Sequence, residues 1–266
     1  MVGFRRCVGE SAFAEGGPVS THDPLEQLYA EQEDPWDYTR DPYEHAKYEA
    51  TLASLPQARY ATGLEIGCSE GVFTRMAAGR VDHLLGVDVS ATAIARAHDR
   101  CADLPGVSFR VLDFIREDLT ERFDVIFCSE VLYYIPPWQR TRVARKIASW
   151  LKPGGDLVLV HTWQEYTRTW DDIFGEGGAE RLHRLFTHVV GLPVIDEHAT
   201  DDYEILVVRS APPVVPSWLR LVERVRLGLL AALPTARRVA RNRMRASPLA
   251  QRLLSRIGVA RSEDAS

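Results

Sequence analysis

Short apolar segments alternate with amphipathic stretches along the middle of the chain, and this alternation predicts strands and helices in turn. Helical spacing of apolar residues is clearest over 91–101 and 139–151. Five segments have the length and the Val, Ile and Leu content of buried strands: 62–67, 83–88, 107–112, 123–128 and 156–161. A βαβ alternation of this kind predicts an α/β fold, a doubly wound and mostly parallel sheet with helices on both faces.

The region ahead of this central pattern has a different character. Residues 23–58 are acidic and aromatic, and Leu25, Leu28 and Tyr29 fall at helical spacing. We expect N-terminal helices that form a lid on the following domain. Residues 1–22 show no period and are predicted to be a disordered extension.

The region after the central pattern contains two apolar segments, around 189–195 and 204–209, close enough in sequence to form an edge hairpin. Prolines then interrupt the pattern, and residues 211–266 are predicted to be a linker followed by an Arg-rich helical tail. The folded domain is therefore expected to span residues 23–210.

The composition is that of an ordinary globular protein, with 45% hydrophobic and 26% charged residues. Apolar stretches are far shorter than the roughly 18 residues needed to cross a bilayer, so no transmembrane segment is expected. The N-terminus lacks the continuous apolar segment of a signal peptide, and the four cysteines are scattered without metal-ligand spacing. We therefore expect a cytoplasmic protein.

Charge is distributed unevenly along the chain. Residues 217–261 contain 11 Arg and a single acid, Glu223, although the whole chain has a formal net charge of −5. The tail therefore has three candidate docking partners, namely the protein's own acidic body, a second subunit and an anionic membrane surface. No nucleic-acid partner is expected.

Residues 64–71, LEIGCSEG, combine the end of a buried strand, a small-residue loop and the start of a helix. A dinucleotide-binding fingerprint requires glycine at the positions of Gly67, Ser69 and Val72, and two of the three fail. The motif therefore argues against NAD.

A second interpretation of this loop is the G-x-S-x-G nucleophile elbow of hydrolases, with Asp88 and His161 following Ser69 in the hydrolase order. The elbow normally lies deep in its sheet, whereas Ser69 follows the first recognisable strand. A hydrolase that uses Ser69 stays a remote alternative.

A third interpretation is that the loop resembles the first loop of class I S-adenosylmethionine-dependent methyltransferases. Their acid-x-G-x-G-x-G pattern corresponds to Glu65, Gly67, Ser69 and Gly71. Serine in place of the middle glycine still permits the close backbone approach that the methionine part of the cofactor requires. The resemblance implies that these four residues bind S-adenosylmethionine.

Further matches follow in the order of that superfamily. Asp88, with Val89 beside it, ends the second strand, where a carboxylate can accept both ribose hydroxyl protons. Asp113 and Phe114 end the third strand, at the position where the superfamily holds the adenine.

Residues 123–126 and 151–155 resemble the motifs of strand four and of the turn before strand five. The ordered matches over residues 60–162 identify the chain as resembling a Rossmann-like class I methyltransferase.

The segment ahead of the cofactor loop narrows this resemblance. Residues 34–38 (DPWDY) and 43–48 (YEHAKY) resemble the same segment in the nodulation N-methyltransferase-like group and in bacterial sugar methyltransferases. The nodulation group acts on amino sugars of chitooligosaccharides, so the resemblance implies a small polar acceptor. It places Lys47 and Tyr48 near the cofactor carboxylate and Trp36 near the substrate, with simple packing as the alternative for Trp36.

Chemistry is expected beyond the carboxyl ends of strands four and five, because ligands of open α/β sheets lie there. His161 is the first candidate for a general base that activates a hydroxyl acceptor, and Glu130, which also belongs to the predicted cofactor site, is the second. Tyr133, Tyr134 and Trp163 are candidate walls for a sugar ring.

Metal assistance stays open, because the acid pairs 171–172 and 201–202 offer hard oxygen ligands for a divalent ion such as Mg²⁺. We predict an S-adenosylmethionine-dependent methyltransferase of a sugar, nucleotide sugar or glycosylated natural product. O-methylation is slightly favoured because a base is available, and N-methylation of an amino sugar is the alternative. A non-catalytic cofactor-binding module is more remote, like the hydrolase.

Overall fold

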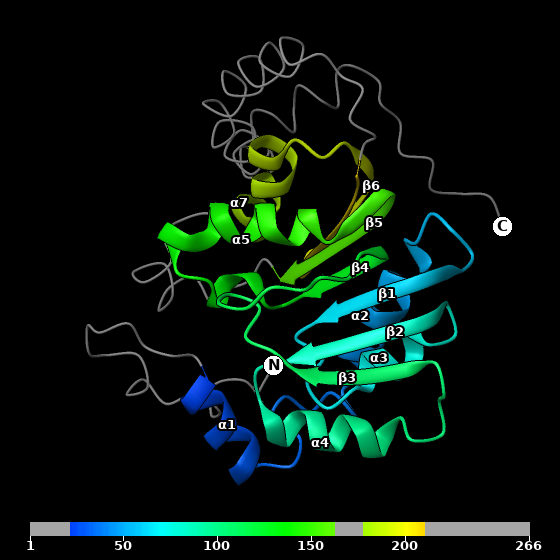
Figure 1. The fold of residues 1–266 in the computed structure, drawn as a ribbon, viewed down its shortest axis with the longest axis vertical. Helices are drawn as coiled ribbons and strands as arrows, with labels where there is room; N and C mark the ends of the chain where they lie inside the picture. Colours follow the sequence, from blue (N-terminus) through cyan, green and yellow to red (C-terminus); the bar gives the residue numbers. More distant parts are fainter. Residues whose placement is uncertain (1–21, 163–177, 211–266) are drawn as a thin grey trace, which may run out of the picture. The chain divides into compact units, whose positions relative to one another are not determined.

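The computed structural model describes residues 22–162 and 178–210, and the elements below belong to these ranges (Figure 1). They lie within one compact unit, Met1–Val214, while a second unit, Val215–Ser266, lies outside the described residues. The predictions for residues 1–21, Trp163, the acid pair 171–172 and the Arg-rich tail also fall outside them.

A seven-stranded sheet forms the centre of the domain, with strand order β3-β2-β1-β4-β5-β7-β6 (Figure 1). The first five strands pair in parallel, β7 is antiparallel to β5, and β6 is antiparallel to β7. Their bounds are β1 Tyr60–Ile66, β2 Val81–Asp88, β3 Val107–Val111, β4 Phe123–Ser129, β5 Leu151–Thr162, β6 Val194–Ala199 and β7 Tyr203–Arg209. The predicted doubly wound, mostly parallel sheet is confirmed.

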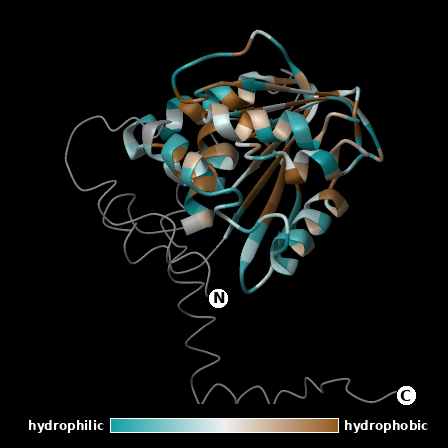
Figure 2. Ribbon diagram, turned by 90° about the horizontal axis from the view of Figure 1, so that it is seen from below, coloured by the Kyte–Doolittle hydropathy of each residue, from teal (hydrophilic) through white to brown (hydrophobic). Residues whose placement is uncertain are grey.

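Helices cover both faces of this sheet. One hydrophobic cluster joins the sheet to α5 and α7, and another joins the opposite face to α2 and α3, while α4 packs beside α3 against β2 and β3. Figure 2 shows the brown, apolar strands enclosed between helices whose outer surfaces carry teal, polar residues. The helical elements are α1 His22–Glu31, α2 Pro42–Ala53, α3 Val72–Ala77, α4 Ala91–Arg100, the 3₁₀ turn η3 Leu132–Tyr134, α5 Pro137–Ser149, α7 Gly178–Arg184 and the π-helical turn η4 Leu185–Val190.

Local sequence explains where several helices begin. Asp41 caps α2 by accepting a hydrogen bond from the Tyr43 amide, and Pro42 occupies the first helical position, where its missing N–H costs nothing. Ser90 caps α4 in the same way through the Ala93 amide. The chain therefore turns into α4 directly after β2.

The edge hairpin forms, but its first strand lies later in the sequence than predicted. Residues Leu185–Val190 make a π-helical turn that ends at Gly191, where φ is +83°, and β6 begins only at Val194. Every residue of β6 is exposed, so this edge strand lacks the alternating burial that would have revealed it. The prediction of a strand over 189–195 was therefore wrong for the first residues of this segment, which precede β6.

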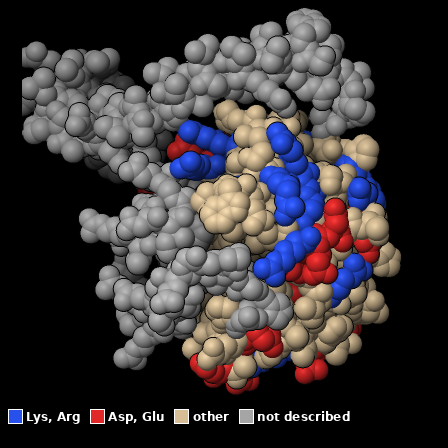
Figure 3. Space-filling model, turned by 60° about the vertical axis from the view of Figure 1, so that its left-hand side comes forward, with Lys and Arg blue, Asp and Glu red and all other residues tan. Residues whose placement is uncertain are grey.

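Surface charge on the face seen in Figure 3 is mixed, with Lys and Arg side chains lying next to groups of Asp and Glu over the described residues. Ion pairs account for part of this pattern, for example Arg110 with Glu121 at 2.8 Å. None of the helices in the described ranges is both long and apolar enough to cross a membrane.

The strand order reverses direction between β1 and β4. Connections from β1 run toward β2 and β3, whereas those from β4 run toward β5. The carboxyl ends of the two strands therefore flank the crevice in which open α/β sheets bind ligands. The loop after β1 and the turn after β4 carry six of the predicted site residues, namely Gly67, Ser69, Gly71, Glu130, Tyr133 and Tyr134.

Candidate active site

The loop after β1 has the left-handed backbone that its glycines predict. Backbone φ is +75° at Gly67, +49° at Ser69 and +77° at Gly71. A Cβ atom at Gly67 would lie 2.2 Å from Val131 Cγ1, and one at Gly71 would lie 3.1 Å from Ala97 Cβ. Glycine is therefore required at both positions, because the loop is pressed between the turn after β4 and helix α4.

Asp88 ends β2 and joins this loop to the start of α4. Its Oδ2 accepts a hydrogen bond from the Ser69 amide at 2.9 Å, and its Oδ1 accepts one from the Ser90 amide at 3.0 Å. Burial raises the pKa of the Asp88 carboxyl, although these amide donors oppose the shift. A carboxylate in this position retains lone pairs for a ribose, as the sequence predicts.

Glu65 is a buried acid at the end of β1 that faces the same crevice. The Thr74 hydroxyl donates a hydrogen bond to its Oε2 at 2.5 Å. Desolvation raises the pKa of Glu65 to about 8, and the nearby Asp88 carboxylate adds to the shift. A cationic ligand placed beside Glu65 would reverse this penalty, so the residue fits the positively charged part of S-adenosylmethionine.

Helix α1 and the segment after it lie over the cofactor loop. The Tyr29 hydroxyl and the Ser69 Oγ are 2.7 Å apart, and Trp36 Nε1 donates to the Tyr29 hydroxyl at 3.1 Å. Glu26 accepts hydrogen bonds from the hydroxyls of Ser90 at 2.6 Å and Thr92 at 2.5 Å. The predicted N-terminal helices are therefore tied to the residues that surround the predicted cofactor site.

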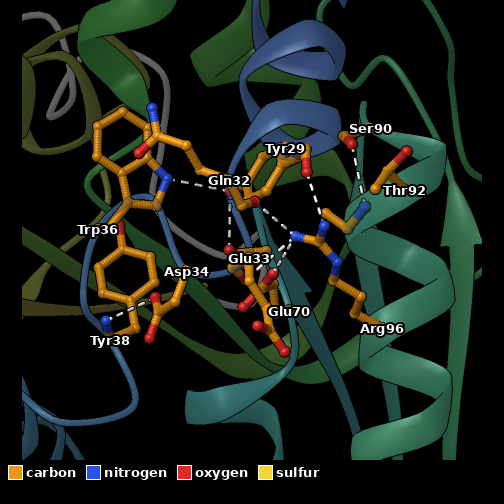
Figure 4. Close-up of polar contacts among 12 residues, drawn as sticks. Tyr29, Gln32, Glu33, Asp34, Trp36, Tyr38, Glu70, Ser90, Thr92 and Arg96 are labelled. Atoms are coloured by element: carbon orange, nitrogen blue, oxygen red, sulfur yellow. Dashed lines mark hydrogen bonds and ion pairs between the residues drawn. The ribbon is translucent and has the colours of Figure 1, made fainter. Parts of the chain in front are cut away.

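Arg96 on α4 fastens the other end of α1, as Figure 4 shows. Its guanidinium donates to the backbone carbonyls of Tyr29, Gln32 and Glu33 at 2.8–3.1 Å and to Glu70 Oε1 at 2.6 Å. A cation at the end of a helix satisfies the last carbonyls and complements the helix dipole. The sequence analysis missed Arg96, since nothing local links it to a helix more than 60 residues earlier.

The turn after β4 carries residues that are predicted to face the acceptor. Glu130 has a left-handed backbone with φ of +54°, which is unfavourable for a residue with a side chain. Its Oε1 lies 3.3 Å from Lys47 Nζ, and its Oε2 accepts a hydrogen bond from the Tyr133 hydroxyl at 2.9 Å. The two predicted residues Glu130 and Tyr133 are thus brought together.

Lys47 on α2 is buried between two carboxylates. Its ammonium lies 3.0 Å from Glu44 Oε1 and 3.3 Å from Glu130 Oε1. Burial alone would lower the pKa of Lys47, but the two carboxylates outweigh it and raise the pKa. The ammonium predicted to reach the cofactor carboxylate therefore contacts Glu44 and Glu130, and Tyr48 beside it lines the pocket.

His161 lies in the core rather than at the surface of the crevice, which corrects its prediction as the general base. The side chain is fully buried. Nε2 accepts a hydrogen bond from the Leu132 amide at 3.4 Å, and Nδ1 lies 2.9 Å from Nε2 of His183. Because both ring nitrogens are engaged within the protein, neither is available to an acceptor in this conformation.

The remaining predicted residues surround the crevice in different ways. Asp113 accepts hydrogen bonds from the Ile115 and Arg116 amides and so shapes the turn after β3. Phe114 packs partly buried against the core, Val89 is also half-buried, and the ring of Tyr134 lies 4.9 Å from that of Tyr133. The positions of the adenine and of the acceptor stay predictions.

A pocket connects the loop after β1 with the turn after β4. Its charged lining consists of Glu44, Glu65 and Glu130. Within the described ranges, His, Cys, Asp and Glu side chains form no group of three that could hold a metal ion, and the acid pair 201–202 is exposed. The other lining residues are Tyr38, Tyr48, Thr51, Gly67, Cys68, Ser69, Val72, Phe73, Phe127, Cys128, Ser129, Val158 and Val160.

The parallel sheet, the acid-glycine loop after β1 and the carboxylate at the end of β2 define a class I S-adenosylmethionine-dependent methyltransferase. A profile of the family "Nodulation protein S (NodS)" matches residues 18–200, and the chain belongs to this family.

Nodulation protein S of Rhizobium tropici is 31% identical over 204 residues, which are 75% of this chain and 85% of that protein. Nodulation protein S of Bradyrhizobium diazoefficiens is 32% identical over 171 residues, 62% of this chain and 80% of that protein. The crystal structure of N-methyltransferase NodS from Bradyrhizobium japonicum WM9 in complex with S-adenosyl-L-homocysteine superposes with a TM-score of 0.63. That alignment has 27% identity and covers 73% of this chain and 100% of the other. S-adenosylmethionine is therefore the cofactor.

Proposed function

We propose that this enzyme methylates the amino nitrogen of an amino sugar. The related NodS is named as an N-methyltransferase, and the resemblance of residues 34–48 to the nodulation group implies an amino-sugar acceptor. The proposal replaces the weak preference for oxygen, which depended on His161 as an available base.

The acidity of the pocket carries this proposal. Glu44, Glu65 and Glu130 line it, and Lys47, held between Glu44 and Glu130, is the cation paired with these acids in the described structure. Glu65, whose raised pKa keeps it mostly protonated until a cation binds, is left to the cofactor. The Lys47 ammonium offsets only one of the two carboxylates that it contacts, Glu44 and Glu130, so this part of the pocket favours a cationic ligand. An amino sugar in its ammonium form supplies such a charge, whereas a neutral hydroxyl does not.

The residues of the turn after β4 are suited to the proton transfer that an amine needs. When bound, S-adenosylmethionine supplies a methyl group on a positively charged sulfur. An ammonium must lose a proton before its nitrogen can attack, and the Glu130 carboxylate is positioned to accept that proton. The Tyr133 hydroxyl and Lys47 hold the carboxylate from two sides, so its orientation is set before the acceptor arrives.

The direct test compares two chitooligosaccharides of equal length, one with free amino groups and one fully N-acetylated. We expect release of S-adenosylhomocysteine with the free-amine oligomer only, and mass spectrometry should locate the methyl group on nitrogen. Equal methylation of the N-acetylated oligomer would show that a hydroxyl is the acceptor. Binding of S-adenosylmethionine without turnover of either oligomer would show that the acceptor is of another class.

A pair of variants tests the role of the carboxylate. Glu130→Gln keeps the shape but removes the proton acceptor, and we expect kcat to fall by about 10²-fold or more. Glu121→Gln makes the same chemical change in an exposed ion pair with Arg110 and should leave kcat unaltered. Unchanged kcat in Glu130→Gln would mean that the amine loses its proton to solvent.

A further inference from the structure

Two histidines and a glutamate form a buried row of polar side chains behind the turn after β4. His161 comes from β5, His183 from α7 and Glu204 from β7, and their exposed fractions are 0%, 3% and 5%. His161 Nδ1 lies 2.9 Å from His183 Nε2, and His183 Nδ1 lies 3.2 Å from Glu204 Oε2. His183 Nδ1 and Glu204 Oε2 are buried and form no hydrogen bond in the described structure, and their separation of 3.2 Å makes each the natural partner of the other.

The protonation pattern of this row follows from its first member. The Leu132 amide can only donate, so His161 Nε2 must accept and His161 must carry its proton on Nδ1. His161 Nδ1–H then donates to His183 Nε2, which leaves the His183 proton on Nδ1, facing the Glu204 carboxylate. A single backbone amide therefore sets the tautomer of both rings.

We propose that His183 and Glu204 are positioning residues that act through His161 to hold the Leu132 amide, and with it the turn that carries Glu130 and Tyr133. The expected effect on kcat rests on the proposed function of Glu130, whereas the expected tautomers of His161 and His183 do not depend on that function.

The turn needs such a hold because its backbone is unfavourable. Glu130 has φ of +54°. The next residue, Val131, is pressed against Gly67, where an added Cβ atom would lie 2.2 Å from Val131 Cγ1. Leu132 starts the 3₁₀ turn that follows directly. The hydrogen bond from the Leu132 amide therefore fixes the backbone between Glu130, which has the unfavourable φ, and Tyr133, whose hydroxyl orients the Glu130 carboxylate.

The charged and titratable groups around the row come from four elements. They are Lys47 on α2, Tyr133 in η3, Glu197 on β6 and Glu204 on β7. Burial, the neighbouring His183 and Lys47 hold the pKa of His161 well below its ordinary value, so His161 itself stays neutral.

Nitrogen-15 NMR of histidine-labelled wild-type protein tests the tautomers directly and needs no acceptor. We expect His161 and His183 both to carry the proton on Nδ1 near neutral pH, with the Leu132 amide protected from hydrogen exchange. A proton on Nε2 of His161 at neutral pH would overturn the proposal.

Kinetics of variants test the positioning role. In His183→Leu we expect kcat to fall by about ten- to a hundredfold, because a displaced catalytic carboxylate loses its alignment, while the affinity for S-adenosylmethionine is kept. In Glu204→Gln we expect a smaller fall in kcat, because the amide oxygen can still accept a hydrogen bond from His183 Nδ1–H. His188→Gln, a partly buried histidine of the next turn that bonds to Thr187, is the matched control and should behave as wild type.

The outcomes separate this proposal from the proposed function. Wild-type kcat in both variants would refute the positioning role, and so would parallel losses of cofactor affinity and thermal stability. If NMR shows the expected tautomers but the enzyme methylates no amino sugar, the proposed arrangement of His161, His183 and Glu204 stands. The proposed acceptor class is then wrong.

Discussion

The buried acid Glu65 makes the affinity for S-adenosylmethionine depend on pH in a way that can be calculated. With a pKa of about 8 in the free protein, roughly one molecule in a hundred has an ionised Glu65 at pH 6, and half of them have one at pH 8. If the cationic cofactor binds the ionised form, the affinity should rise about fiftyfold between these pH values, equivalent to about 2 kcal/mol.

Titration calorimetry in two buffers of different ionisation enthalpy measures both parts of this prediction. Besides the rise in affinity, about 0.9 proton should be released per cofactor bound at pH 7, because most Glu65 carboxyls must ionise on binding. Glu65→Gln shares every other titrating group with the wild type and should bind with little dependence on pH. A flat wild-type profile, or the same slope in Glu65→Gln, would refute the reasoning.

The same pKa predicts the stability of the protein without cofactor. The folded pKa of Glu65 is raised above its ordinary value of 4.5, so the folded state binds more protons than the unfolded state between pH 4.5 and about 8. The free energy of unfolding should therefore fall as pH rises through this window, by up to about 5 kcal/mol from this residue. Thermal melts of the wild type and Glu65→Gln should converge at the acidic end and diverge at the alkaline end.

Three further substitutions test the rest of the site. Asp88→Ala leaves the buried amides of Ser69 and Ser90 without acceptors, so unfolding should become easier by about 2–4 kcal/mol in chemical denaturation and calorimetry should show weaker cofactor binding. Ser69→Ala should keep methyl transfer and lose about 1 kcal/mol of stability, whereas loss of methyl transfer would mean that the contact of Ser69 with Tyr29 is needed to form the site. Arg96→Met removes the hydrogen-bond donors that hold the end of α1, so hydrogen exchange over residues 22–31 should accelerate while the sheet stays protected. Unchanged exchange would mean that α1 is held by its apolar contacts alone.

Local sequence was sufficient for the elements whose signal lies within a few residues. Buried parallel strands are continuous apolar segments, and the loop around Gly67 and Gly71 announces its left-handed backbone through the glycines themselves. Asp88 was predictable for the same reason, since its place at the end of an apolar strand fixes which edge of the sheet it occupies. The edge strand β6 was misplaced because no residue of it is buried, and so no hydrophobic period marks it.

Residues whose role depends on distant partners were decided only by the tertiary structure. His161 ends an apolar strand, where it was predicted to face the crevice, yet the packing of α7 and β7 encloses it with His183 and Glu204. Lys47 and Glu130 are 83 residues apart and meet because α2 covers the sheet beside the carboxyl end of β4. The sequence by itself determined the cofactor class and the sheet that carries it, because those signals are local periodicity and spacing. Which side chains face the acceptor depends on how the helices pack, and packing is a property of contacts that no short segment of the chain contains.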